Sequence, residues 1–250
     1  MAPRRHRPAV HARARGLARR AFRRAQTLLS RKNKPKCIQV FISPSATSLS
    51  GLKDGSVIGS ASLRRQAQIL ARNPTLKCVN FRGNVQTRLR KLDEGVVDAT
   101  LLAYAGLKRM DMADEATAIL EWEEMLPAVA QGAIGIQCRD DDERALKYID
   151  ALNHEETFTC VSCERAFLAA LDGNCKTPIA GQAQIIDGEL RFQGLVSAVD
   201  GSKIYRSSKV GAPADAEKIG RDAGEEIKAE AGIEFFAWLQ QEEEAASASA

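Results

Sequence analysis

Apolar runs alternate with helical patterns from residue 38 to residue 109. Strands are predicted over four short apolar runs: Ile38–Ile42, Val57–Ile58, Cys78–Val79 and Asp98–Ala103. Between them, Leu63–Ala71 and Val85–Leu92 have the residue pattern of helices, and Pro44–Lys53 is predicted as a loop or short helical turn. Strands alternating with helices are typical of an α/β domain with a parallel sheet.

The pattern changes after Leu126-Pro127-Ala128, which is a candidate hinge. A strand over Gln131–Cys138 and a helix over Asp141–Leu152 follow, and they fit neither neighbouring part of the chain. A third region is predicted from its elements: a helix Thr159–Leu171, strands Ala183–Ile186, Leu190–Leu195 and Lys203–Ser207, and a closing helix Ala214–Ala231. The acidic, low-complexity end 240–250 is expected to be disordered.

Two strand-to-helix turns of the first region carry an unusual load of arginine. Ser60, Ser62 and Asn84 are good N-cap types, and free N–H groups at a helix start favour an anion. Four arginines lie at these turns, at Arg64, Arg65, Arg82 and Arg88, and the next turn adds Lys108 and Arg109. Ligands of parallel sheets bind beyond the carboxyl ends of the strands. The pattern therefore favours a cleft for a polyanionic ligand over the alternative, a solvated basic face.

The charge of the chain is unevenly distributed. Thirteen of the 36 Lys and Arg residues lie in residues 1–36, which contain no Asp or Glu. The other 214 residues hold 23 basic and 32 acidic side chains, a net charge of −9, so the folded part does not have the charge of a nucleic-acid-binding protein. Segment 1–36 is interpreted as a transit-peptide-like or disordered basic tail, or as a wrongly assigned upstream exon, with no contribution to a core. The sequence has no apolar run long enough for a membrane-spanning helix.

The cysteines indicate reduced thiols. The six residues (Cys37, Cys78, Cys138, Cys160, Cys163 and Cys175) lack the spacing of a disulfide framework. Cys160 and Cys163 form a C-x-x-C on a predicted helix, but there is no second cysteine pair, and His154 is the only histidine beyond the basic tail, so no metal site is expected. Cys175 follows a helix and precedes Lys176, whose charge favours the thiolate, so Cys175 is either structural or a nucleophile or attachment site.

Seven motifs, in order, resemble those of the hydroxymethylbilane synthase (porphobilinogen deaminase) family, most closely its plant and algal chloroplast members. They are Gly-Ser-Ala-Ser-Leu-Arg-Arg-Gln (59–66), Phe-Arg-Gly-Asn-Val-Gln-Thr-Arg-Leu (81–89), Ala-Gly-Leu-Lys-Arg (105–109), Leu-Pro-Ala-Val-Ala-Gln-Gly-Ala (126–133), Leu-Asn-His-Glu-Glu-Thr (152–157), Glu-Arg-Ala-Phe-Leu (164–168) and Gly-Asn-Cys-Lys-Thr-Pro-Ile-Ala (173–180). The resemblance covers about Phe41–Trp238.

The resemblance implies a site and a reaction. Cys175 would carry a dipyrromethane cofactor through a thioether, with Ser62, Arg64, Arg65, Arg82, Gly83 and Arg88 binding the cofactor and Lys108, Arg109 and Gln131 the substrate. Four porphobilinogens would be deaminated and joined into hydroxymethylbilane, the linear precursor of haem and chlorophyll, without a metal. The expected partners are porphobilinogen and the linear intermediates, with no nucleic acid and no membrane, and the protein is expected to be a monomer. A plastid-stroma location is implied, or a cytoplasmic one if residues 1–36 are not a transit peptide.

The sequence departs from the family in one respect. The family's N-terminal domain carries a His-Ser-Met-Lys-Asp-Val-Pro motif with the catalytic Asp, whereas the first Asp of this chain is Asp54, so no catalytic residue is assigned. The resemblance thus implies this division: tail 1–36, anion-binding α/β domain 38–126, hinge and remnant of a first domain 127–153, smaller C-terminal α/β domain 154–239 and tail 240–250. The first of these domains would be ligand-binding-protein-like.

The missing motif affects the expected activity and stability. Weak or no deaminase activity is expected of this chain, and Ile134, Ile136 and Leu146 should be exposed in the incomplete domain. The alternatives are a non-catalytic tetrapyrrole- or anion-binding module and an RNA-binding protein that uses the basic tail. The acidic body and the lack of an aromatic platform argue against RNA binding.

Overall fold

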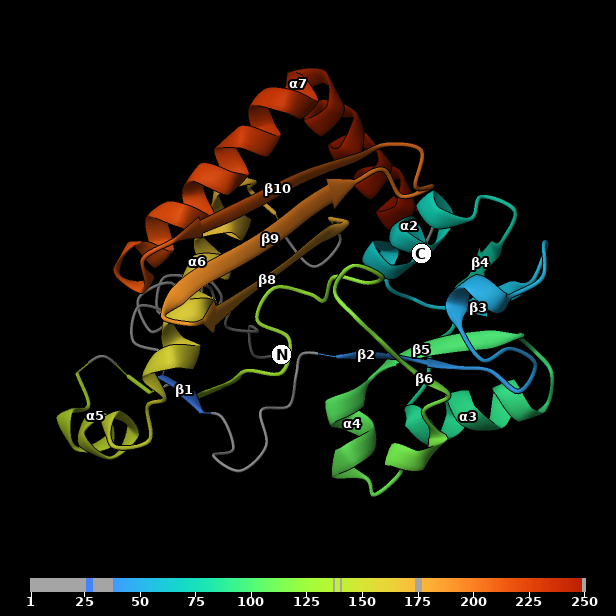
Figure 1. Ribbon diagram of the computed structural model, residues 1–250, viewed down its shortest axis with the longest axis horizontal. Coiled ribbons are helices and arrows are strands. Elements are labelled where there is room, and N and C mark those ends of the chain that lie inside the picture. The colour runs from blue at the N-terminus through green and yellow to red at the C-terminus, as the bar shows by residue number, and fades with distance from the viewer. Residues whose placement is uncertain (1–25, 29–37, 137, 140, 174–176, 249–250) are drawn as a thin grey trace, which may run out of the picture. The chain divides into compact units, whose positions relative to one another are not determined.

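The computed structural model describes residues 26–28, 38–136, 138–139, 141–173 and 177–248 (Figure 1). Within these ranges the chain forms two compact units, one containing residues 26–28 and 133–158 and the other containing residues 38–132 and 159–248. The remaining residues of the basic tail, together with Cys37 and Cys175, lie outside the described residues, so the interpretations given to them stay predictions.

A five-stranded sheet organises the first part of the larger unit. Its strands, in sheet order, are β4 (Lys77–Val79), β3 (Val57–Gly59), β5 (Ala99–Ala103), β2 (Gln39–Ile42) and β6 (Ala118–Leu120). Strand β3 is parallel to β4 and β5, whereas β2 is antiparallel to β5 and β6. The α/β fold class and a sheet with parallel strands are confirmed, although β2 runs in the opposite direction to its neighbours. An apolar run predicts that a strand is buried on both faces, and it carries no information about the direction of that strand.

Alternate residues of the strands face two separate cores, because successive side chains in a strand point to opposite faces. Phe41 and Leu101 pack with Ile69 of helix α2 (Leu63–Arg72). On the other face, Val40 and Leu102 pack with residues of α3 (Val85–Asp93) and α4 (Tyr104–Arg109). The sheet is therefore a central layer between α2 on one face and α3 and α4 on the other (Figure 1). Short 3-10 turns occur at Leu49–Gly51, Ala113–Glu115 and Pro213–Asp215.

The second part of the larger unit is a three-stranded antiparallel sheet covered by two helices. The strands are β8 (Ile179–Ile186), β9 (Glu189–Ser197) and β10 (Ile204–Gly211), and the helices are α6 (Glu155–Ala170) and α7 (Ala216–Ala248). Phe167 of α6 and Phe192 of β9 meet with ring centroids 4.9 Å apart. The two helices approach so closely that a Cβ at Gly220 would lie 2.0 Å from the Cys163 carbonyl oxygen.

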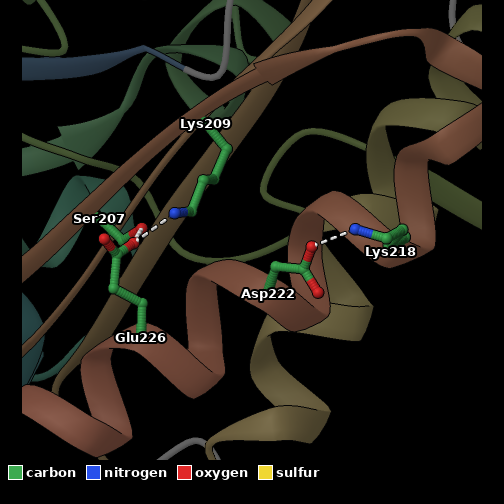
Figure 2. A network of polar contacts seen from close by, with 5 residues as sticks. All are labelled: Ser207, Lys209, Lys218, Asp222 and Glu226. Carbon is green, nitrogen blue, oxygen red and sulfur yellow. Dashed lines mark hydrogen bonds and ion pairs between the residues drawn. The ribbon is translucent and has the colours of Figure 1, made fainter.

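Polar contacts add to this packing between β10 and α7. Lys209 Nζ lies 2.8 Å from Glu226 Oε2, and the Ser207 hydroxyl donates a hydrogen bond to the same oxygen (Figure 2). These bonds, first from Lys209 and then from Ser207, lower the pKa of the Glu226 carboxyl. A second pair, Lys218 and Asp222, joins successive turns of α7 at 2.6 Å. The network ties the helix to the sheet edge.

Helix α7 extends beyond its predicted end at Ala231. It breaks its regular geometry at Gly232, which has φ 76°, and then continues to Ala248. Phe235 and Leu239 are buried after the break, so apolar packing holds the second part of the helix. The start of segment 240–250, which was expected to be disordered, is helical as far as Ala248. No helix among the described residues is both long and apolar enough to span a bilayer.

The smaller unit contains a strand that the sequence did not predict. Strand β1 (Gln26–Leu28), in the segment expected to contribute nothing to the fold, pairs antiparallel with β7 (Ile134–Ile136). Helix α5 (Glu143–Asp150) follows. Ile134 is 60% exposed, as expected, and Ile136 is half-buried. The expected exposure of Leu146 was wrong, because Leu146 lies on the buried side of α5 and only 8% of its surface is exposed.

Candidate anion-binding site

The turn between β3 and α2 is closed by its own polar groups. The Ser60 amide donates to the Val79 carbonyl at 3.0 Å, and the Ser60 hydroxyl accepts from the Ser62 amide at 3.2 Å. Ser62 occupies the N-cap position of α2 in an extended conformation, but its side chain makes no cap hydrogen bond. Gly59 allows the close approach of the Phe81 ring, which a Cβ there would meet at 2.6 Å. The helix start is therefore fixed mainly by Ser60 and by packing.

The turn between β4 and α3 presents its backbone differently. Asn84 caps α3 as predicted, because its Oδ1 accepts from the Thr87 amide at 2.8 Å. Gly83 has φ +136°, a conformation that strongly favours glycine, and its carbonyl accepts from Arg88 Nε at 3.0 Å. Arg82 is exposed, and its Nε donates to Asn80 Oδ1 at 3.3 Å. This turn thus holds Arg88 against the backbone and leaves Arg82 in solvent.

Arg65 of α2 is buried, with 8% of its surface exposed. Its Nε donates to Gln39 Oε1 at 2.9 Å, Nη2 donates to the same oxygen, and Nη1 donates to the Leu101 carbonyl at 2.9 Å. All of these acceptors are neutral. The guanidinium is therefore fixed in orientation while its charge remains unbalanced.

Burial and neighbouring charges make this a strongly cationic site. Burial lowers the pKa of the Arg64 guanidinium to about 10. Burial, and then the charges of Arg64 and Arg88, lower the pKa of Arg65 to about 9. Across the described parts of the chain, no carboxylate forms an ion pair with Arg64, Arg65 or Arg88. Three cations with no ion-paired carboxylate among the described residues would favour the binding of an anion.

Two glutamines join this cluster to the candidate hinge. Gln39 Nε2 donates to Gln131 Oε1 at 2.8 Å, so Gln131 contacts Arg65 only through Gln39. Gln131 Nε2 and Arg64 Nε are both buried without a hydrogen-bond partner. The sequence analysis missed Gln39. The available signal was a single polar residue inside the apolar run Ile-Gln-Val-Phe-Ile, since a polar side chain buried in a strand needs a partner.

The other predicted residues are not joined to the cluster by these contacts. Lys108 and Arg109 are exposed in the last turn of α4, where Lys108 Nζ lies 5.6 Å from the Tyr104 ring centroid. Cys175 lies outside the described residues. Cys163 is fully buried, and burial raises the pKa of its thiol to about 12, which disfavours a reactive thiolate.

Sequence analysis also missed Glu164 of α6, which is 4% exposed. Its Oε2 accepts from the Ala130 amide at 2.6 Å and its Oε1 from the Ala183 amide at 2.9 Å. Burial raises the pKa of this carboxyl to about 7, although the two amide hydrogen bonds act in the opposite direction. The available signal was its place in the motif Glu-Arg-Ala-Phe-Leu, where it is the acidic residue of an otherwise core-facing helix turn.

Two family models match the chain. The dipyromethane cofactor binding domain of porphobilinogen deaminase matches residues 22–147, and the C-terminal domain of porphobilinogen deaminase matches residues 158–229. The first match contains β1 to β7, the first part of α5 and all the arginines described above. The description of this domain names dipyrromethane, the same cofactor that the resemblance implies.

Relatives from plants and bacteria give the same result. The chain is 58% identical over 204 residues to the chloroplastic porphobilinogen deaminase of Oryza sativa subsp. japonica, covering 80% of this chain and 57% of the relative. It is 58% identical over 200 residues to that of Pisum sativum, with 78% and 54% covered, and 50% identical over 196 residues to the enzyme of Nitrobacter hamburgensis, with 78% and 62% covered. The chain therefore spans a little over half the length of these relatives. By its two matched domains and its identity to these proteins, the chain belongs to the porphobilinogen deaminase family.

Proposed function

We propose that the cluster Arg64, Arg65 and Arg88 binds the carboxylates of a dipyrromethane cofactor and of the pyrrole units added to it, as part of a porphobilinogen deaminase. The observation that carries this proposal is the neighbouring pair of guanidinium groups, half-buried Arg64 and buried Arg65, with no carboxylate partner among the described residues. Burying a cation without a counter-ion is costly, and a ligand carboxylate would remove that cost. Acetate and propionate groups on a pyrrole are ligands of this kind.

The residues present fit such a cofactor. Arg64 Nε is a buried donor without a partner, and arginine binds carboxylates through a planar fork of donors. The carbonyl of Gly83 holds Arg88, while Arg82 is free to reach outward from the same turn. When bound, the cofactor supplies a pyrrole carbon to which porphobilinogen units are joined as ammonia leaves. The arginines of the chain would hold the carboxylates in place and exclude competing anions.

Binding of porphobilinogen, measured by calorimetry, tests this proposal. Arg65→Met should weaken the affinity about tenfold to hundredfold, the effect of removing a charge-assisted hydrogen bond. Arg90→Met is the matched control, because Arg90 is exposed and pairs with Glu94 at 2.8 Å on the same domain. An unchanged affinity in Arg65→Met would contradict the assignment. Arg82→Leu then tests whether the exposed arginine shares the site.

Cys175 is the proposed attachment residue, since it lies in Gly-Asn-Cys-Lys-Thr-Pro and its thiolate would be favoured by Lys176. Intact-mass spectrometry of a longer form of the protein should show an adduct of two pyrrole units. The adduct should be absent after Cys175→Ser. An adduct that survives this substitution would move the attachment elsewhere.

A plastid location is proposed from the chloroplastic relatives in rice and pea. A fluorescent fusion that keeps residues 1–36 should accumulate in plastids, and deletion of those residues should abolish import. Accumulation in the cytosol with residues 1–36 intact would contradict a transit role for them.

A further inference from the structure

We propose that Glu164 is a positioning residue for Arg65, acting through the backbone at Ala130 and the side chains of Gln131 and Gln39. The inference rests on the proposed function for its consequence, which is ligand affinity. Its structural part rests on hydrogen bonds within one unit of the chain, and it can be tested with no ligand present.

The chain of contacts Glu164–Ala130–Gln131–Gln39–Arg65 is called the relay below. It begins at the buried carboxyl group of Glu164, which joins two segments that are distant in sequence. Glu164 on α6 accepts the amide of Ala183 on β8 and, 34 residues back along the chain, the amide of Ala130. Ala130 has φ +57°, a left-handed conformation that alanine rarely adopts. Such a conformation persists only where the surroundings hold it. Glu164 supplies the hydrogen bond that does so.

The rest of this segment is fixed at points further from Gln131. The Gln68 side chain bonds both the amide and the carbonyl of Leu126, at 2.9 and 3.0 Å. The Pro127 carbonyl accepts from the Gly181 amide at 3.1 Å. The Gln131 amide donates to the Ala128 carbonyl at 3.0 Å, which closes a turn around Ala130. The hydrogen bond from the Ala130 amide to Glu164 anchors this turn, and the turn sets where the Gln131 side chain begins.

The second half of the relay selects one orientation of Gln39. A guanidinium has donors only, so Gln39 must present its oxygen to Arg65. Its NH2 group then points the other way and needs an acceptor, which is Gln131 Oε1 at 2.8 Å. If Gln131 moved, this acceptor would be lost, and the flipped amide would place donors against donors. Gln131 thereby determines how firmly Arg65 is held.

Hydrogen exchange of the Arg65 Nε–H group, followed by nitrogen-15 NMR, tests this relay. Gln has one acceptor oxygen for the two amides that Glu164 binds, so Glu164→Gln should speed exchange at both the Ala130 amide and Arg65 Nε–H by about tenfold, as expected from losing one hydrogen bond. Gln131→Ala should speed exchange at Arg65 and leave the Ala130 amide protected. Glu155→Gln is the matched control on the same helix, because Glu155 is exposed and accepts a hydrogen bond from Asn153 outside this chain of contacts.

Two further variants, Gln131→Ala and Glu164→Asp, keep the test decisive. If Glu164→Gln does not fold, Gln131→Ala and Glu164→Asp still report whether Arg65 responds. Faster exchange at Ala130 with Arg65 unchanged would overturn the inference, because Glu164 would then stabilise only the segment around Ala130.

Porphobilinogen titrations distinguish a failure of the positioning role from a failure of the proposed function. A parent chain that fails to bind refutes the proposed function and leaves the relay to the exchange data. A parent that binds, with equal affinity in Glu164→Gln, refutes the positioning role.

Discussion

Arg64 and Arg65 are neighbours on α2, yet their surroundings differ. The guanidinium of Arg65 has three hydrogen bonds to protein oxygens, whereas Arg64 keeps a buried Nε without a partner. Arg65 is thus preorganised, and Arg64 is the less satisfied of the two. If these groups bind a ligand as proposed, the site would trade stability of the free protein for affinity, as binding sites commonly do.

The first prediction concerns the stability and the ligand affinity of a variant at Arg64. Arg64→Met removes a desolvated cation and should raise the free energy of unfolding by about 1–2 kcal/mol while weakening carboxylate binding. Urea denaturation monitored by circular dichroism measures the change. Arg90→Met, which removes an exposed cation, should change stability by less than about 0.5 kcal/mol. A destabilised Arg64→Met would show that Arg64 already has a stabilising partner.

Glu164 gives a pH-dependent prediction. Its pKa rises from 4.5 to about 7 on folding, so the folded state binds this proton more tightly than the unfolded state. The contribution to stability is fully present below pH 4.5 and is lost as the pH rises to 7, amounting to about 3 kcal/mol. Relative to Glu164→Gln, the parent should therefore lose stability across this window. A constant difference between pH 4.5 and 7 would contradict the raised pKa.

Single residues were predictable from sequence only where a local pattern marked them. The arginines follow strands and lie at helix starts, so they could be found. The roles of Gln39 and Glu164 could not be found, because they depend on partners far away in sequence: 92 residues separate Gln39 from Gln131, and 34 separate Ala130 from Glu164. For Gln39, the sequence offered one hint, a polar residue inside an apolar run.

At the scale of elements, periodicity located the helices and most strands of the larger unit, with α2 observed at Leu63–Arg72 against a predicted Leu63–Ala71. It failed for strand direction, since β2 runs antiparallel in an otherwise parallel group. It also missed the three-residue strands β1 and β6, Gln-Thr-Leu and Ala-Ile-Leu.

Two helix starts that look alike in sequence should differ in stability. Asn84 caps α3 through a side-chain hydrogen bond, whereas Ser62 occupies the N-cap of α2 without one. Asn84→Ala should therefore cost about 1 kcal/mol of the free energy of unfolding, and Ser62→Ala less than about 0.5 kcal/mol. Thermal denaturation of the two variants compares them directly. Equal losses would show that the Ser62 hydroxyl caps its helix in solution.

At the scale of the whole molecule, the 250-residue chain by itself should consume porphobilinogen slowly or not at all. The family motif with the catalytic Asp is not in this sequence, and loss of a general acid costs about two to four powers of ten in rate. Asp98, a conceivable substitute, already accepts the Val57 amide at 2.7 Å.

A colorimetric assay of porphobilinogen consumption measures this rate, beside a form joined to a family N-terminal domain. Consumption by the chain alone within about tenfold of the joined form would contradict the prediction, since a positioned general acid contributes more than that. It would also favour a proton donor within these residues over the alternative of a non-catalytic anion-binding module.

Site-resolved titration tests the central claim most directly. Porphobilinogen is added to the nitrogen-15-labelled chain, and the Nε–H signals of Arg64, Arg65 and Arg88 are followed by NMR. Because the electrostatic effects on Arg65 join these three groups, their signals should shift together with a single dissociation constant, while that of Arg90 stays unchanged. Shifts confined to exposed cations such as Lys108 and Arg109, or no saturable shift in the cluster, would contradict the account.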